Sequence, residues 1–207
     1  MSRPWYRREI GEPLSWLIGI LSTAIALEGL RAFSLSTYVS IYSYYIVGVV
    51  IGMVIHELMH RNVARRYGLR SRYVVNPLGV IITLITTPLP FKIIAPGYTS
   101  VYSLGLASPW RERRGFAASV VAGPLSNMVL STVTLIAGGL LALAGSPASI
   151  MASQWLIGFS WVNAYLAFFN LLPIPPLDGS KVFRFSVILW GILFVISIAL
   201  LIVASIL

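Results

Sequence analysis

The sequence predicts an all-α polytopic membrane protein, with five transmembrane helices and a small membrane-associated β-hairpin or sheet between the second and third. Two observations predict this class. Hydrophobic residues make up 57% of the 207 residues and charged residues only 10%, whereas soluble domains are roughly half apolar and about a quarter charged. The apolar residues also lie in long runs that suit hydrocarbon. We therefore expect a single transmembrane domain over residues 1–207.

Each predicted span is an apolar run long enough to cross a bilayer. A helix needs roughly 20 mostly apolar residues to cross about 30 Å of hydrocarbon. Five runs meet this requirement, at about residues 14–35, 38–60, 116–144, 150–172 and 183–206. A basic stretch precedes the first run, but no small-residue cleavage site follows its apolar core, so we expect a retained span rather than a signal peptide.

The basic residues predict the orientation of these spans. If the N-terminus is cytoplasmic, only Arg31 of the fifteen Lys and Arg residues lies outside, as the positive-inside rule requires. The net charge of +9 is thereby explained by membrane topology, and no nucleic-acid partner is expected. The sequence predicts a multi-pass protein of the cell membrane, in contact with the lipid bilayer.

The segment between the second and third spans has a different pattern. Leu78 to Leu89, LGVIITLITTPL, is apolar and rich in β-branched residues, but its twelve residues are too few to cross. Runs of this kind favour strands over helices. We expect an interfacial β region at about residues 72–106, and a re-entrant helix is the alternative.

His56, Glu57 and His60 lie at the end of the second span, in the sequence IHELMHR. Residues four apart on a helix share a face, with Cβ atoms about 5 to 6 Å apart, so the two imidazoles could bind one ion. Zinc suits them, since its catalytic sites combine three protein ligands with a water molecule. Glu57 would then lie close enough to take a proton from that water, which is the metalloprotease pattern His-Glu-x-x-His.

A structural role explains this cluster less well than a functional one. The two histidines are the only ones in the chain, and ionisable residues within a span are costly and mark function by default. A third ligand must be a carboxylate, because the chain has no Cys and no other His.

Asp178 is the carboxylate that remains after elimination of the others. Glu57 is assigned as the base, and the remaining acids are poorly placed, before the first span, among loop arginines or beside Arg31: Glu9, Glu12, Glu28 and Glu112. Asp178 lies in NLLPIPPLDGSKVF, where prolines break the fourth helix and Gly179 permits a turn. The broken segment could fold back toward the second span.

Three motifs occur in order along the chain: His-Glu-x-x-His at 56–60, AGPLSN at 122–127, and Asn-x-x-Pro-x-x-x-Leu-Asp-Gly at 170–179. Together they resemble the site-2 protease family of intramembrane zinc metalloproteases, in a minimal form without PDZ or CBS domains. The resemblance implies that His56, His60 and Asp178 bind Zn²⁺ and that Glu57 is the catalytic base.

The resemblance has further implications. It gives Asn127 a catalytic role near the metal, holding the substrate or the oxyanion, while Asn170 is expected to secure the broken helix. Because strands of the family offer an edge to the substrate, a single-span membrane protein is expected to bind extended along a strand at about 78–94. The family often has six spans, where this sequence predicts five.

The expected function is hydrolysis of a peptide bond in or near a transmembrane segment, as in regulated intramembrane proteolysis, at a site toward the cytoplasmic side. Two alternatives are a membrane metal-ion transporter, for which the acids are too few, and a catalytically silent zinc-binding scaffold, which would not need Glu57. Two other protease classes are excluded. An aspartyl type requires two Asp residues, and a serine type would need a His besides the metal pair.

Overall fold

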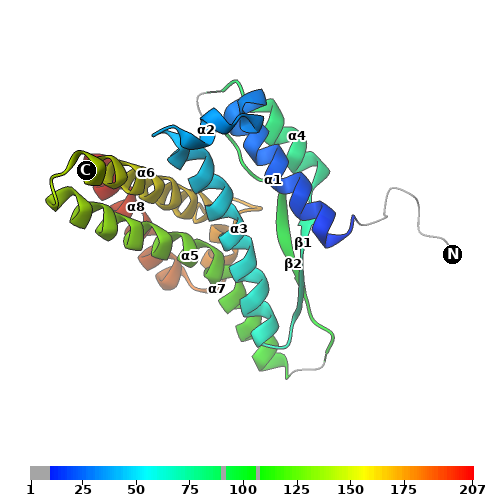
Figure 1. Ribbon diagram of the computed structural model, residues 1–207. Helices are drawn as coiled ribbons and strands as arrows, with labels where there is room; N and C mark the ends of the chain where they lie inside the picture. The colour runs from blue at the N-terminus through cyan, green and yellow to red at the C-terminus, as the bar shows by residue number, and fades with distance from the viewer. Residues whose placement is uncertain (1–9, 90–91, 106–107) are drawn as a thin grey trace.

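The computed structural model describes residues 10–89, 92–105 and 108–207, so the predicted basic stretch at residues 3–8 lies outside the described residues. Helix α3 (Ser43–Arg66) runs through the middle of the molecule (Figure 1). On one side lie α1 (Glu12–Glu28), α4 (Pro77–Ile85) and a two-stranded sheet. On the other side lie α5 (Pro109–Leu143), α6 (Pro147–Asn170), α7 (Asp178–Phe185) and α8 (Val187–Ile206).

Within the described residues, four helical segments are long and apolar enough to cross a membrane. They are Glu12–Phe33, Ser43–Arg66, Pro109–Leu143 and Val187–Ile206. These segments correspond to the first, second, third and fifth predicted spans, in agreement with the predicted class. The first is α1 extended by a short 3-10 helix, η2 (Gly29–Phe33), and a single short helix, α2 (Leu35–Val39), leads from it to α3.

The fourth predicted span, residues 150–172, is helix α6, which is long enough to cross but is not among these four. The reason is polar residues such as Gln154, Ser160 and Asn163. Two of them, Ser160 and Asn163, are fully buried, because α6 packs against α3, α5 and α8. A helix enclosed by other helices does not need an apolar surface, so mean hydropathy underrates it.

The predicted fifth span, residues 183–206, is divided in the structure. Ser186 has extended backbone between α7 and α8, and its hydroxyl accepts a hydrogen bond from the Leu189 amide. This N-cap starts a new helix at Val187. Before α7, the chain folds back so closely that a Cβ on Gly179 would overlap the carbonyl of Leu171.

The prediction of a strand over residues 78–94 is wrong, because Pro77–Ile85 forms helix α4. Asn76 caps this helix by accepting from the Leu78 amide, and Pro77 stands at its first turn. Gly79 and Thr83, four residues apart, are buried. The Thr83 hydroxyl also accepts from the Ala95 amide. The cap and this small buried face outweigh the β propensity of the isoleucines and threonines.

The predicted β structure between the second and third spans is present, at strands β1 (Arg70–Val75) and β2 (Gly97–Tyr102). They pair antiparallel, with Arg70 opposite Tyr102 and Tyr73 opposite Thr99. Tyr73 is buried and stacks on Trp16 of α1, with ring centroids 4.1 Å apart. The sheet packs against α1 and α3, which brings β2 next to the histidine helix.

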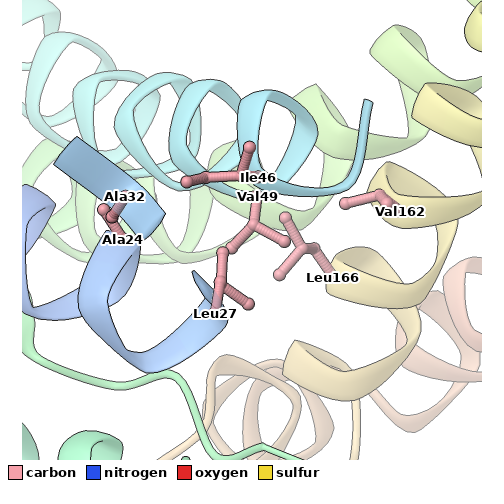
Figure 2. Close-up of a cluster of buried hydrophobic side chains, with 7 residues drawn as sticks. All are labelled: Ala24, Leu27, Ala32, Ile46, Val49, Val162 and Leu166. Carbon is pink, nitrogen blue, oxygen red and sulfur yellow. The ribbon is translucent and has the colours of Figure 1, made fainter. Parts of the chain in front are cut away.

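A cluster of buried apolar side chains joins α1, α3 and α6 beside the N-terminal half of α3 (Figure 2). Its members are Ala24, Leu27, Ala32, Ile46, Val49, Val162 and Leu166. Close packing of this kind leaves little freedom for side chains or helices to shift. The cluster therefore fixes the position of α3 relative to α1 and α6.

Candidate metal centre

His56 and His60 lie on the face of α3 that points toward α5. Both residues are buried, with 5% and 6% of their surface exposed. Their ring centroids are 4.6 Å apart and the ring planes are nearly perpendicular, at 82°. The helical spacing thus places two imidazoles side by side, as the sequence predicts.

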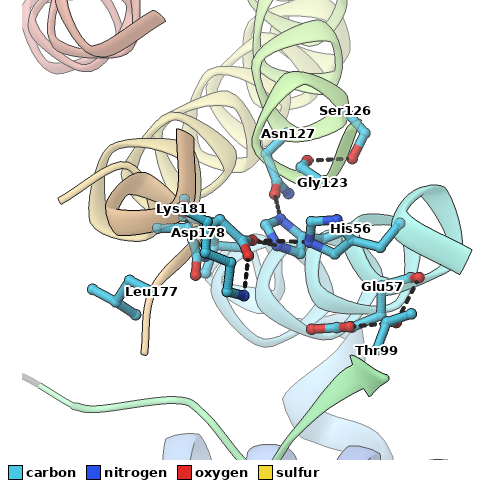
Figure 3. A network of polar contacts seen from close by, with 12 residues as sticks. His56, Glu57, Thr99, Gly123, Ser126, Asn127, Leu177, Asp178 and Lys181 are labelled. Carbon is cyan, nitrogen blue, oxygen red and sulfur yellow. Dashed lines mark hydrogen bonds and ion pairs between the residues drawn. The ribbon is translucent and has the colours of Figure 1, made fainter. Parts of the chain in front are cut away.

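Asp178, the first residue of α7, reaches both rings. Its Oδ2 atom lies 3.2 Å from Nε2 of His56 and 2.9 Å from Nε2 of His60 (Figure 3). The nearest ligand atoms of all three residues lie within 4.8 Å of one another. The break after α6 therefore brings together groups 122 residues apart in the sequence.

The three donors fit a single metal ion. Two imidazole nitrogens and a carboxylate oxygen that leave further positions open suit zinc, and the same set also suits ferrous iron. Space at the donors depends on Gly123 of α5, because a Cβ there would overlap Nε2 of His60 and lie 2.7 Å from Nε2 of His56. The glycine lets α5 pass directly beside the ligand atoms.

His60 is oriented by the backbone of α5. Its Nδ1 atom lies 2.6 Å from the carbonyl oxygen of Ser119, which can only accept a hydrogen bond, so Nδ1 is the donor. Nε2 then keeps a lone pair on the side of Asp178. In return, the Ser119 hydroxyl donates to the His60 carbonyl at 2.8 Å. Sequence reasoning did not identify Ser119, because no local pattern marks this contact.

His56 is oriented by a side chain of α5. The amide oxygen of Asn127 lies 2.6 Å from Nδ1 of His56, on the opposite side of the ring from Asp178 (Figure 3). Asn127 is fully buried, at 0% exposure. Asn127 thus contacts a histidine of the candidate metal site. Its expected catalytic role, holding the substrate or the oxyanion, stays a prediction.

Glu57 lies on the side of α3 that faces the sheet, apart from the three metal donors. Its Oε2 atom accepts a hydrogen bond of 2.7 Å from the Thr99 hydroxyl of β2 (Figure 3). The same hydroxyl lies 3.0 Å from the Glu57 carbonyl oxygen. A strand that is distant in the sequence therefore orients the predicted base, and sequence reasoning did not identify Thr99.

The second oxygen of Asp178 is paired with a cation. Oδ1 accepts from Nζ of Lys181 at 2.8 Å, and the lysine side chain is half exposed. Burial alone would raise the pKa of Asp178, but its contacts with His60 and His56 and the charge of Lys181 together hold that pKa well below its usual range. The carboxylate is therefore ionised, which is the form that binds a cation.

Asn170, which was expected to secure the broken helix, is the last residue of α6. Its amide donates to the carbonyl of Leu166 one turn earlier. This bond ties the Asn170 side chain to the last turn of its own helix. Trp190 of α8 donates to the next carbonyl beyond the helix, that of Leu171.

Comparison with known proteins adds a family to this geometry. The profile of peptidase family M50 matches residues 136–192, which include Asp178. The chain is 38% identical over 151 residues to "Putative zinc metalloprotease MJ0611" of Methanocaldococcus jannaschii, and the alignment covers 71% of this chain and 72% of the relative.

Two bacterial relatives carry similar names. "Putative zinc metalloprotease Rip2" of Mycolicibacterium smegmatis is 32% identical over 167 residues, which cover 75% of this chain and 60% of the relative. "Putative zinc metalloprotease YwhC" of Bacillus subtilis is 26% identical over 157 residues, which cover 69% of this chain and 68% of the relative. No solved structure gives a significant match.

Proposed function

The chain belongs to peptidase family M50, the site-2 protease family, and from this premise we propose that it is an intramembrane zinc metalloprotease of the His-Glu-x-x-His type. Its reaction would be hydrolysis of a peptide bond in or next to the transmembrane segment of a membrane protein. One observation carries the proposal: the ligand atoms of His56, His60 and Asp178 lie within 4.8 Å of one another, and Glu57 directly follows the first of these residues in the sequence.

The donor set supports zinc as the cofactor, held by Nε2 of His56 and His60 and by Oδ2 of Asp178. When bound in such a site, zinc polarises a carbonyl and makes water more acidic. The names of the three relatives favour zinc over iron.

Glu57 would perform the proton transfers. Its carboxylate takes a proton from the attacking water while the water oxygen bonds to the scissile carbonyl carbon, and it then donates that proton to the leaving amine as the C–N bond breaks. The Thr99 hydroxyl donates to Glu57 Oε2 and so holds the carboxylate in one orientation. Glu57 directly follows the ligand His56 in the sequence, so the base and the metal site belong to the same turn of α3.

The membrane topology is proposed to have five crossings, with α6 as the fourth. The helix has 24 residues, enough to span, and neighbouring helices cover its polar residues. The positive-inside bias favours a cytoplasmic N-terminus. In that orientation the site lies toward the cytoplasmic side, because Arg61, Arg65 and Arg66 directly follow His60.

The substrate is proposed to be a single-span membrane protein, which must lose part of its helix before its carbonyls can be attacked. The segment expected to receive it, residues 78–94, begins with helix α4 and cannot provide the edge. Strand β2 is better suited, because within the described residues β1 is its only partner strand and it carries Thr99 against Glu57. An extended substrate could pair with the free edge of β2 and so recover main-chain hydrogen bonds.

The test uses the purified full chain in lipid vesicles with a single-span membrane protein. Wild type is expected to contain about one zinc per chain and to cleave the substrate. Glu57→Gln keeps the shape of the side chain but cannot accept the proton, so it should retain zinc and lose cleavage. Glu28→Gln, a change outside the site, is the matched control and should keep both zinc and cleavage.

Two results would contradict the proposal. Cleavage at the wild-type rate by Glu57→Gln would remove Glu57 as the base. Zinc movement across the vesicle membrane without proteolysis would favour the transporter. Among the described residues, only one group of three potential metal ligands is found, whereas transport would need a series of sites across the bilayer.

A further inference from the structure

Two buried amide side chains, Asn127 of α5 and Asn163 of α6, lie on the Nδ1 side of His56. Neither has any exposed surface. Asn127 belongs to the AGPLSN motif, but Asn163 belongs to none of the three motifs that mark the family resemblance. Buried amides need partners for both their oxygen and their nitrogen, and here the two amides bond to each other and one of them bonds to His56.

Two backbone carbonyls determine which end of each side-chain amide is the nitrogen and which is the oxygen. Asn163 Nδ2 donates to the carbonyl of Phe159 at 3.0 Å, and Asn127 Nδ2 donates to the carbonyl of Gly52 at 3.1 Å. A carbonyl oxygen only accepts, so the atoms that face these carbonyls must be nitrogens. Asn163 Oδ1 is therefore left to accept from Asn127 Nδ2, at 3.0 Å.

This arrangement decides which tautomer the neutral His56 ring adopts. With Asn127 Nδ2 committed to Gly52 and Asn163, its Oδ1 faces His56 Nδ1 at 2.6 Å. An amide oxygen can only accept, so His56 Nδ1 carries the hydrogen. The lone pair of Nε2 is then directed to the side of Asp178, where a metal would bind.

The contact between the three helices depends on Gly52 of α3. A Cβ at this position would lie 2.6 Å from Asn163 Oδ1 and 3.2 Å from Asn127 Nδ2. Without the side chain, α3 approaches both amides closely enough for its own carbonyl to accept from Asn127. The glycine, the two amides and the histidine form one connected hydrogen-bond system.

We infer that Asn163 is a positioning residue for the metal centre: through Asn127 it sets the tautomer and the direction of His56. The inference rests on the proposed function in that it takes the His56, His60 and Asp178 group to be the metal site. It extends the site to α6, a helix that supplies no ligand of its own. Groups that orient ligand histidines typically change metal affinity or activity roughly 10- to 100-fold when removed.

The test measures zinc affinity of the full chain in detergent by competition with a chromophoric chelator. Asn163→Leu has a similar volume but no polar atoms, and it should weaken zinc binding roughly 10- to 100-fold. Asn163→Ala, which only removes atoms, is the second variant should the leucine not fold, and its affinity should fall in the same direction.

Ser160→Ala is the matched control. Ser160 lies one turn before Asn163 in the same interface, and its hydroxyl bonds to the carbonyl of Ser131 of α5 at 2.8 Å. Its hydrogen bonds are to Ser131 and do not lead to His56. It should therefore bind zinc as wild type does. An equal loss of affinity in Ser160→Ala would overturn the inference, because general loosening of the α5 and α6 interface would then explain the effect.

A second readout observes the rings themselves. The chain has only two histidines, so ¹⁵N-histidine labelling of the zinc-loaded protein gives NMR signals from two rings. In Asn163→Leu or Asn163→Ala, the Nδ1–H signal of His56 should shift as its hydrogen bond weakens. The signal of His60, which donates to a backbone carbonyl, should stay in place as the internal control.

The outcomes separate the inference from the proposed function. A folded Asn163 variant with wild-type affinity and an unmoved His56 signal would overturn the inference and leave the protease proposal standing. A wild-type chain without zinc affinity would overturn both. Neither measurement uses proteolysis, so a failure to find the substrate affects neither result.

Discussion

The two histidines of the candidate metal site lie one turn apart on α3, yet the protein holds them by different means. His60 donates to a backbone carbonyl, that of Ser119. His56 donates to the amide oxygen of Asn127, which is itself oriented through Asn163. The two hydrogen bonds are equally short, at 2.6 Å, so the difference is in what supports each acceptor.

The difference teaches which parts of the site a substitution can disturb. No side-chain change removes the carbonyl of a helix, so the anchor of His60 should survive most substitutions in α5. The anchor of His56 consists of side chains, and one substitution can delete it. Both anchors have the same result, because each turns Nε2 of its ring toward Asp178.

The largest effect is expected for Gly123→Ala, which disturbs both histidine rings regardless of whether backbone or side chains hold them. Gly123→Ala places a Cβ against Nε2 of His60 and His56. To relieve this overlap, either the two rings or the whole of α5 would have to move, because the backbone of a single helical residue cannot shift without its neighbours. We expect zinc binding to fall more than about 100-fold, beyond the usual effect of groups around the ligands, as measured by metal content after dialysis. Gly139→Ala in the same helix meets no atom within 4 Å and should retain zinc. Full zinc in Gly123→Ala would contradict the placement of α5.

Asn127→Leu should break only the anchor of His56. The leucine has a similar size but leaves the Nδ1–H of His56 and the carbonyl of Gly52 without this partner. Zinc affinity, measured by chelator competition, should decrease roughly 10- to 100-fold. An affinity within a factor of about three of wild type would mean that packing alone orients the ring.

Thr99→Val sharpens the comparison by separating the base from the ligands. The hydroxyl donates to the Glu57 carboxylate, and hydrogen bonds to charged groups contribute about 1.5 to 3 kcal/mol. Since about 1.4 kcal/mol corresponds to a tenfold rate, kcat should fall roughly tenfold or more. Zinc content and KM should change little, and Thr99→Ser should restore kcat. A valine variant with lower zinc content instead would place Thr99 among the supports of the metal.

The smallest effect is expected for Ser119→Ala. The change deletes the hydroxyl bond to the His60 carbonyl but keeps the backbone carbonyl that holds the ring. Thermal unfolding should show a loss of about 1 kcal/mol, as for one buried hydrogen bond, with zinc affinity unchanged. If Ser119→Ala weakened zinc binding as much as Asn127→Leu, the contrast between a backbone and a side-chain anchor would fail.

Predictions from the sequence were accurate for features that depend on residues close together in the chain. The long apolar runs locate the helices, and the spacing of His56 and His60 locates their shared face. It was wrong for residues 78–94, where β-branched residues suggested a strand. The Asn76 cap and the small face at Gly79 and Thr83 made a helix instead. Propensity is a weak signal that packing against other segments can reverse.

The sequence by itself limited the candidate donors: with two histidines and one aspartate in the chain, few metal sites were possible. Only the tertiary structure decided how they are held. The contacts of His56 with Asn127 and Asp178 join residues 71 and 122 positions apart, and the Thr99 contact with Glu57 joins residues 42 apart. Helical periodicity reaches only the next turn or two, whereas these contacts exist because whole helices pack against one another, and no local pattern records that packing.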